Sequence, residues 1–410
     1  MKILHTSDWH LGQLFYGFDR WAEHNLFLDW LLITLKNEDI DVLLISGDVF
    51  DVSNPSAASI KMFYAFLINA VKTCPELQII VTAGNHDSAS RLETPQPLVE
   101  LMNIHIVGSV KRDAAGNIDF ESMVVPLKNR SGEIKAWCIA APFLRMGDYP
   151  HISDCENPYA EGVADFYRQA FAYASAKREP HQAIVAMGHL HTLRAEIGDL
   201  HSVEREIMGG IEGILPSAFD DEICYVALGH IHKAQCVGGK EHVRYCGSPL
   251  PMSFSELNYK HRVTVFDIEG AKAANIRHCD IPVSVPLRRI TGTLDEALDE
   301  IATLPSSEKP GDFAPFLEVR VLLESPEPSL KYRIDEALKG KNVRLARIDA
   351  RVKNSPLNSR ETQLNSKEKL KKIQPIDLLH TLYRTKYAQP LPENLTRLFL
   401  QVTEEVNQAE

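Results

Sequence analysis

The chain has 410 residues, of which 44% are hydrophobic and 24% are charged. At about 150 residues per domain this length predicts two or three domains, and the apolar fraction is typical of a soluble globular protein with a sizeable core. The formal net charge of −11 disfavours a stand-alone DNA-binding protein, because phosphate contacts require a basic surface. If the substrate is a nucleic acid, we expect a partner to supply much of the binding surface.

The sequence also bears on where the chain works. Its first residues run straight into an apolar, strand-like segment, without the basic region, long apolar stretch and cleavage site of a secretory signal. No apolar run approaches the roughly 18 residues that a membrane span requires. The seven cysteines are odd in number and form no C-x-x-C pair, which is typical of reduced thiols. We therefore expect a cytoplasmic protein with no membrane partner.

Short apolar runs alternate with helical stretches over residues 1–282, and two of the helical stretches are 23–35 and 57–71. Apolar runs that end at glycine or asparagine are typical of buried strands in an α/β sandwich, with loops at the carboxyl ends of the strands. The predicted strands are 3–6, 42–46, 79–82, 136–140, 183–187 and 225–228.

The last part of this region has a different pattern. Residues 243–246, 262–268 and 276–279 alternate as successive strands, and we expect them to close the domain as a meander. Pro282 and Pro286 follow, so the pattern predicts that the first domain ends at residue 282.

A second, smaller unit is predicted over residues 283–350. Strand-like segments begin near residues 285, 316 and 343, and helical segments lie between them. Thr293 and Glu296 form the capping-box pattern that marks the start of the first helix. The βαβαβ order predicts a compact α+β cap.

The C-terminal part is first basic and then amphipathic. Residues 351–374 carry seven basic side chains against two glutamates, which indicates either a solvated linker or a basic arm near DNA. In residues 375–410, apolar side chains recur at helical spacing. This pattern predicts two short amphipathic helices that pack on their own domain or dock on a partner.

Five short segments bearing histidine or carboxylate recur within the first 232 residues, each at the end of a predicted strand. Any one of them is weak evidence, but five in order indicate a shared site. Together they supply enough oxygen and imidazole ligands for two divalent metals, which points to phosphoester hydrolysis by a two-metal mechanism. The segments are Asp8-Trp9-His10, 47–51 with Asp48 and Asp51, 84–87 with Asn85 and His86, Gly188-His189, and 229–232 with His230 and His232.

Two neighbouring ions need a bridging anion, and Asp48 at a strand tip suits that role. We expect Asp8 and His10 to hold one ion and Asn85 and His189 to hold the other. Each ion would also be bound by one of the two late histidines, His230 and His232. The spacing leaves open which late histidine serves which ion. Mixed oxygen and nitrogen ligands favour manganese, iron or zinc over calcium. The candidate metal ligands are Asp8, His10, Asp48, Asn85, His189, His230 and His232.

His86 follows the candidate ligand Asn85, and its imidazole is placed to protonate the leaving alkoxide or to stabilise charge on the phosphate. Asp51 lies three residues after Asp48. We expect its carboxylate to orient His86 and to raise the protonated fraction of that ring. We expect His5 to be a hydrogen-bonded core residue, and His191 either to support a ligand from behind or to be structural.

The ordered segments resemble those of the calcineurin-like metallophosphoesterase superfamily. Within it, residues 4–12 (LHTSDWHLG), 46–51 (SGDVFD), 83–88 (AGNHDS) and 227–232 (ALGHIH) are similar to the SbcD family, the nuclease subunits of bacterial SbcCD complexes. The likeness is strong over residues 1–255 and is one of layout in the cap and tail. It implies a four-layer α/β/β/α sandwich with a small α+β capping domain and a C-terminal helical tail.

The resemblance also implies an activity and a setting. The activity is manganese-dependent hydrolysis of DNA phosphodiesters: ATP-dependent exonuclease action on double strands, and endonuclease action on hairpins and single strands, in DNA repair, recombination and replication. The implied partner is an SbcC-type coiled-coil ATPase, which alone uses ATP and on which the tail docks. The implied assembly is a heterotetramer containing a homodimer of this chain, in the cytoplasm at the nucleoid.

By position, the seven candidate ligands match the metal ligands of the family, and His86 matches its catalytic histidine. Archaeal and eukaryotic relatives generally carry histidine at the position of Asp51, whereas bacterial SbcD carries aspartate. This departure favours an Asp51–His86 dyad here over a second catalytic histidine.

Two other functions are compatible with the segments. One is a small-substrate phosphatase or phosphodiesterase of the same superfamily, which would need neither the cap nor the amphipathic tail. The other is a non-catalytic scaffold that binds DNA ends, for which a complete ligand set is not expected.

Overall fold

The computed structural model describes residues 1–153, 155–193, 195, 213–307 and 310–352, with single positions further on at 383, 392, 395, 396 and 399. Apart from these single positions in the predicted tail, the tail and almost all of the predicted linker therefore lie outside the described residues. By internal packing the chain forms two units. The first comprises Met1–Ile290, Glu300–Val319 and Ala337–Ile348, and the second comprises Thr291–Asp299, Arg320–Glu336 and the described residues from Asp349 on.

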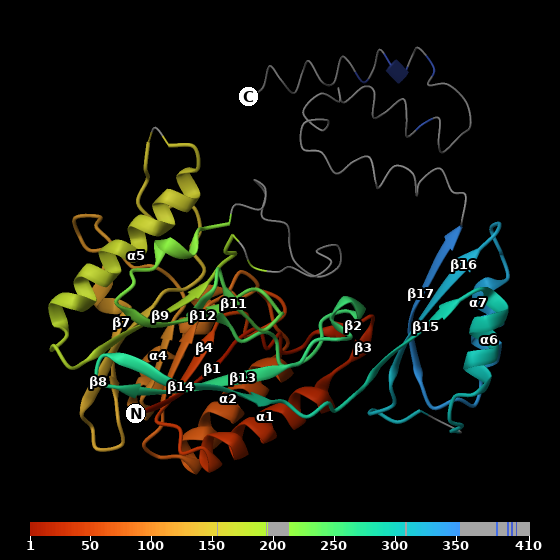
Figure 1. Cartoon of the computed structure of the whole chain (residues 1–410), viewed down its shortest axis with the longest axis horizontal. Helices are drawn as coiled ribbons and strands as arrows, with labels where there is room; N and C mark the ends of the chain where they lie inside the picture. The colour runs from red at the N-terminus through yellow and green to blue at the C-terminus, as the bar shows by residue number, and fades with distance from the viewer. Residues whose placement is uncertain are drawn as a thin grey trace. The chain divides into compact units, whose positions relative to one another are not determined.

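Two six-stranded sheets form the body of the first unit (Figure 1). In the first sheet β1, β4, β5 and β6 are parallel, and β13 and β14 are antiparallel at its edge. The spatial order is β14 (Lys272–Asp280), β13 (Arg262–Glu269), β1 (Lys2–Thr6), β4 (Val42–Ser46), β5 (Gln78–Thr82) and β6 (Ile104–Val107).

In the second sheet β8, β9, β10 and β12 are parallel, and the edge strands β7 and β11 are antiparallel to their neighbours. The six apolar runs predicted as strands are all inner strands of the two sheets, and the predicted α/β class is confirmed. The spatial order is β11 (Gln235–Val237), β12 (Lys240–Tyr245), β10 (Ile223–Gly229), β9 (Ala183–His189), β8 (Ile134–Ala140) and β7 (Val124–Lys128).

Successive residues of the inner strands enter two different cores. Leu43 of β4 belongs to the core shared with α1 (Trp21–Asn37) and α2 (Ala57–Thr73), whereas Leu44 faces the second sheet. On the other face of the second sheet lies α5 (Pro158–Lys177), on the opposite side of the body from α1 and α2 (Figure 1). A strand buried on both faces must be apolar at every position, which is why these strands have continuous apolar sequences.

The expected meander is wrong. Strand β12 pairs with β10 in the second sheet, whereas β13 and β14 form a hairpin beside β1 in the first. Each segment is a strand as predicted. Its partner, however, depends on which sheet edge the rest of the chain leaves open, and an alternating pattern carries no information on that choice.

A third sheet has the order β15 (Leu287–Gly292), β16 (Phe316–Leu323) and β17 (Arg344–Val352). Helices α6 (Leu294–Ala302) and α7 (Leu330–Leu338) connect these strands, so the predicted βαβαβ order is confirmed. Each of the three strands runs from the first unit into the second. The predicted capping box is also confirmed, because Oε2 of Glu296 accepts a hydrogen bond from the amide of Thr293 at 2.7 Å.

The remaining elements are short. They are β2 (Leu14–Phe15), β3 (Phe18–Asp19), α3 (Ala89–Glu93), α4 (Gln96–Val99) and the 3-10 turns η1 (Glu100–Met102), η2 (Phe120–Ser122), η3 (Pro216–Ala218) and η4 (Phe254–Glu256). Within the described ranges, no helix has both the length and the apolar character needed to span a bilayer.

Candidate metal centre

All five predicted segments lie at the carboxyl ends of parallel strands. In the first sheet Asp8 follows β1, Asp48 follows β4 and Asn85 follows β5. In the second sheet His189 ends β9 and His230 follows β10. Because β4 contacts both β9 and β10 across the core, the strand ends of the two sheets meet at one edge.

Four of the seven candidate ligands have a left-handed backbone: φ is 54° at Asp8, 45° at His10, 49° at Asp48 and 99° at His230. Residues other than glycine rarely adopt this conformation, which costs about 1–3 kcal/mol per residue and is concentrated at functional sites. Neighbouring loops hold it in place. The amide of Asp8 donates to the carbonyl of Gly47 at 3.0 Å, and the amide of His10 donates to the carbonyl of Asp48 at 3.0 Å.

Two glycines let the loops approach the ligands closely. A Cβ on Gly84 would lie 2.1 Å from Oδ1 of Asp48, and a Cβ on Gly47 would lie 2.2 Å from Nδ1 of His189. Gly47 also has a φ of 83°, where a side chain is strained whatever the space. Both positions therefore require glycine for the shape of the site.

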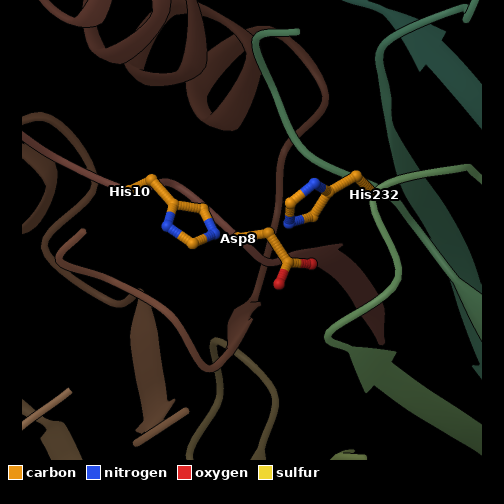
Figure 2. A group of neighbouring side chains, drawn as sticks. All are labelled: Asp8, His10 and His232. Atoms are coloured by element: carbon orange, nitrogen blue, oxygen red, sulfur yellow. The ribbon is translucent and has the colours of Figure 1, made fainter. Parts of the chain in front are cut away.

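Asp8, His10 and His232 form a first group of converging ligand atoms. One ligand atom of each lies within 4.8 Å of the others, and all three side chains are buried. Figure 2 shows the rings of His10 and His232 on either side of the Asp8 carboxylate, each with one ring nitrogen directed toward it. Carboxylate oxygen and imidazole nitrogen at this spacing suit a divalent ion, which these three side chains would hold together.

A second group contains Asp8, Asp48 and His189, with the same spacing of ligand atoms. Beside it, Oδ1 of Asn85 lies 2.9 Å from Nε2 of His189 and 3.1 Å from Nδ1 of His230. The structure thus separates the two late histidines. His232 belongs to the first group, and His230 lies beside the second.

Asp48 belongs to the second group and also approaches the first. Its Oδ2 is 3.6 Å from Nε2 of His10 and 3.3 Å from Nε2 of His189. Its Oδ1 accepts a hydrogen bond from the amide of His86 at 2.9 Å, which fixes the orientation of the carboxylate. A carboxylate that approaches one imidazole of each group has the position required of a bridging ligand.

The polar atoms of the site fit a divalent cation. His10 is fully buried, and neither of its ring nitrogens has a hydrogen-bond partner among the described residues. Nε2 of His189 faces oxygens of Asn85 and Asp48, while its Nδ1 already contacts the carbonyl of Ser46 at 2.9 Å. Buried polar groups are nearly always paired, and a cation would bind these nitrogens and oxygens together.

Asp48 and His189 form a buried ion pair when no metal is bound. Burial alone would raise the pKa of Asp48, but the attraction of His189 outweighs it and holds that pKa well below its usual range. Burial likewise opposes the charge on His189, but the attraction of Asp48 outweighs it and raises the pKa of His189 to about 9. A bound cation would replace the proton of His189, so metal binding should release it.

Asp51 and His86 are neighbours as predicted, but the predicted contact with the Asp51 carboxylate is wrong, because His86 binds the main-chain carbonyl. Nδ1 of His86 lies 2.7 Å from the main-chain carbonyl of Asp51 and donates to it, whereas the Asp51 carboxylate lies 3.3 Å from Nδ1 of His10, outside hydrogen-bond geometry. Burial lowers the pKa of His86 overall, although Asp48 and both the carbonyl and the charge of Asp51 act to raise it, as expected of Asp51. Sequence spacing indicated the neighbours correctly. Which atoms of Asp51 face the ring depends on the direction of the loop backbone.

Asp87, the last residue of the Gly-Asn-His-Asp segment, is not among the predicted site residues, yet it ties three loop amides together. Its Oδ1 accepts from Phe50 at 2.9 Å, and its Oδ2 accepts from Val49 at 3.1 Å and from Gly84 at 2.8 Å. Burial and the nearby Asp48 raise the pKa of Asp87 to about 6. Its position directly after His86 is the sequence signal that could have marked it.

The histidines outside the predicted site have other surroundings. His5 is a core residue as predicted, since it is fully buried with Nδ1 3.1 Å from the hydroxyl of Tyr225. Burial lowers its pKa to about 3. Within the described part of the chain, His191 belongs to none of the groups of possible metal ligands.

Two family models match the chain. The model described as calcineurin-like phosphoesterase matches residues 1–234, which is more than half of the chain and includes every candidate ligand. The model described as type 5 capsule protein repressor C-terminal domain matches residues 283–387.

Several bacterial relatives are named as the SbcD subunit of the nuclease SbcCD. The protein of Rhodobacter capsulatus is 36% identical over 84% of this chain and 86% of its own length. That of Escherichia coli K12 is 35% identical over 72% of both chains, and that of Bacillus subtilis is 30% identical over 70% of this chain and 71% of its own length. The chain therefore belongs to the SbcD family of nuclease subunits, within the calcineurin-like phosphoesterases.

Proposed function

We propose that this chain is the nuclease subunit of an SbcCD-type complex and hydrolyses DNA phosphodiesters with two divalent metal ions, manganese being the preferred metal. The observation that carries the proposal is the position of the Asp48 carboxylate, which belongs to the second ligand group with His189 and also lies 3.6 Å from Nε2 of His10 in the first. Asp8, His10 and His232 are assigned to one ion, and Asn85, His189 and His230 to the other. Asp48 is assigned to both.

Two divalent ions, when bound, polarise the phosphate and generate a nucleophile from water at neutral pH. In this proposal the chain supplies the ligands of both ions and a proton-handling group beside them. We assign that role to His86, which has a ring nitrogen within 4.8 Å of ligand atoms of His10 and Asp48. The carbonyl of Asp51 orients the ring, so that His86 can stabilise charge on the phosphate or donate to the leaving oxygen.

We assign DNA as the substrate and an SbcC-type coiled-coil ATPase as the partner. The relatives support this choice, since each is named as the SbcD component of a nuclease SbcCD. The net charge of −11 supports a partner that supplies much of the DNA-binding surface. In such a complex ATP binds only the partner, and this chain is a homodimer within a heterotetramer in the cytoplasm. The proposed actions are exonuclease cleavage of duplex ends and endonuclease cleavage of hairpins and single strands, in DNA repair, recombination and replication.

We further propose the domain boundaries 1–282 for the nuclease domain, 283–350 for the cap, 351–374 for the basic linker and 375–410 for the tail that docks on the ATPase. The second family model begins at residue 283, which supports the boundary between nuclease domain and cap.

The proposed function is tested by digestion of end-labelled duplex and hairpin DNA in the presence of manganese. The assay is run both with and without the ATPase and ATP. We expect cleavage that EDTA abolishes and that Asp48→Asn, which lacks the shared carboxylate, reduces by at least about 100-fold. A small chromogenic phosphodiester is assayed in parallel. Cleavage of the small substrate but of no DNA would favour the phosphodiesterase, and DNA-end binding without any hydrolysis would favour the scaffold.

A further inference from the structure

A buried carboxylate, that of Glu256, contacts the imidazole of the candidate ligand His232. Glu256 is 6% exposed and ends the turn η4, 24 residues further along the chain. Its Oε1 lies 3.2 Å from Nδ1 of His232. Figure 2 shows the other ring nitrogen of His232 directed toward Asp8. The imidazole therefore lies between Glu256 and the first ligand group.

We propose that Glu256 is a positioning residue for this metal centre: it accepts a hydrogen bond from Nδ1–H of His232 and keeps Nε2 unprotonated and aimed at the ion shared with Asp8 and His10. Histidines that bind metals commonly donate their second N–H to such an oxygen, which fixes the tautomer and the ring orientation and raises the basicity of the ligand nitrogen. This role deepens the proposed two-metal function and rests on it.

Glu256 is itself held firmly. Its Oε2 accepts a hydrogen bond from the amide of Met252 at 2.9 Å. Arg289 donates to the carbonyl of Phe254 in the same turn at 2.6 Å, and Phe254 is 1% exposed. One carboxylate oxygen thus binds the turn, and the other faces His232. A carboxylate fixed in this way can fix the ring that it contacts.

A plainer role for Glu256 would be to cap its own turn. Ser253 and Glu256 have the spacing of a capping box, in which the glutamate binds only backbone at the start of the helix. The contact with His232 is no part of such a box, and it is made by the oxygen that does not contact Met252. His232 is 8% exposed, so water competes little for its Nδ1.

The second ligand group is oriented in another way. Nδ1 of His189 contacts the main-chain carbonyl of Ser46 at 2.9 Å. A neutral carbonyl fixes a ring without bringing a negative charge to it. Removal of the Glu256 charge should therefore weaken binding of the ion at the first group and leave the affinity for the ion at the second group unchanged.

Titration of the metal-free, full-length chain with Mn²⁺ tests the role of Glu256. Binding is measured as the loss of the electron paramagnetic resonance signal of the free ion. Glu256→Gln keeps the shape of the side chain and an oxygen for Met252, but it removes the charge that faces His232. We expect the wild type to bind two ions, and Glu256→Gln to bind one of them about 10- to 100-fold more weakly with the other unchanged.

Ser253→Ala is the matched control. It removes the hydrogen bond that caps the same turn, in which the Ser253 hydroxyl accepts from the amide of Ser255 at 3.3 Å, and it leaves Glu256 in place. We expect this variant to bind both ions as the wild type does. Equal binding by the wild type and Glu256→Gln overturns the proposal. An equal loss in Ser253→Ala also overturns it, because Glu256 would then act only through the turn.

A measurement on the wild type tests the proposal even if the variants fail to fold. Long-range ¹H–¹⁵N spectra of the metal-free chain, labelled on histidine, should show His232 protonated on Nδ1 and unprotonated on Nε2. The opposite tautomer overturns the role of Glu256 and leaves the two-metal function intact. Absence of any manganese binding by the wild type instead contradicts the two-metal function, whatever the tautomer.

Discussion

The side chain of Asp51 lies beside His10, with Oδ1 of the carboxylate 3.3 Å from Nδ1 of the imidazole. The main-chain carbonyl of the same aspartate accepts a hydrogen bond from His86. One residue thus approaches a candidate metal ligand with its side chain and the candidate proton-handling group with its backbone. A side-chain substitution separates the two contacts.

The variant Asp51→Asn keeps the carbonyl that binds His86 and removes the negative charge beside His10. We expect a loss of manganese affinity at one ion of about 10-fold or less, because the Asp51 side chain is 25% exposed and water screens its charge. Manganese titration measures this loss. Unchanged manganese affinity together with lost hydrolysis would contradict this prediction. It would indicate that the Asp51 carboxylate acts on His86 and not on His10.

His86→Ala should leave manganese binding intact and reduce hydrolysis of linear duplex DNA by about 10²- to 10⁴-fold, the usual contribution of a positioned acid or base. The physical reason is that Nδ1 of His86 is already bonded to the Asp51 carbonyl, and the seven other candidate side chains supply the ligands. Cleavage rates and metal titration are measured on the same preparation. Loss of an ion from this variant would show that His86 is a ligand.

Gly84→Ala should destabilise the protein by about 1–3 kcal/mol, as overpacking does, and should displace Asp48. A Cβ at this position would lie 2.1 Å from Oδ1 of Asp48. Urea unfolding in EDTA measures the free energy of unfolding without any contribution from bound metal. Gly311→Ala is the control: nothing lies within 4 Å of its Cβ position, so a change of at most about 0.5 kcal/mol is expected. Similar values for the two variants would contradict the close approach.

His5 should make the protein less stable in mild acid. Burial lowers its folded-state pKa to about 3 from 6.5, so between these values the unfolded chain binds a proton that the folded chain does not. Stability is therefore present above pH 6.5 and is lost as the pH falls toward 3, by about 2 kcal/mol between pH 7 and pH 5. In His5→Asn the loss over this interval should be smaller by that amount, measured by urea unfolding in EDTA. An identical loss in both proteins would show that His5 is not the group responsible.

Deletion of residues 374–410 tests the docking role of the tail, which lies almost entirely outside the described residues. We expect hydrolysis of a small phosphodiester to be unchanged, because every candidate ligand precedes residue 233. Co-purification with the SbcC-type ATPase should be lost, since the apolar spacing of the tail suits a docked amphipathic helix. A deleted chain that still forms the complex would refute the docking role.

The sequence by itself determined the positions of the strands and the chemistry at their ends. Continuous apolar runs can be satisfied only by strands buried on both faces, and β4 coincides with its predicted range 42–46. Parallel strands bring their carboxyl ends to one edge, so polar residues at those ends had to converge once the α/β pattern was recognised. The convergence of Asp8, Asp48 and His189 follows from this argument.

Tertiary structure alone decided the partners. It placed β12 in the second sheet, assigned His232 and His230 to different groups, turned the Asp51 carboxylate toward His10 and brought Glu256 to His232. Apolar periodicity and capping patterns act over a few residues, whereas these contacts join segments whose approach depends on sheet pairing and on loop backbone direction. A local pattern can therefore specify which residues reach the site, but the packing of the whole chain specifies which atoms meet there.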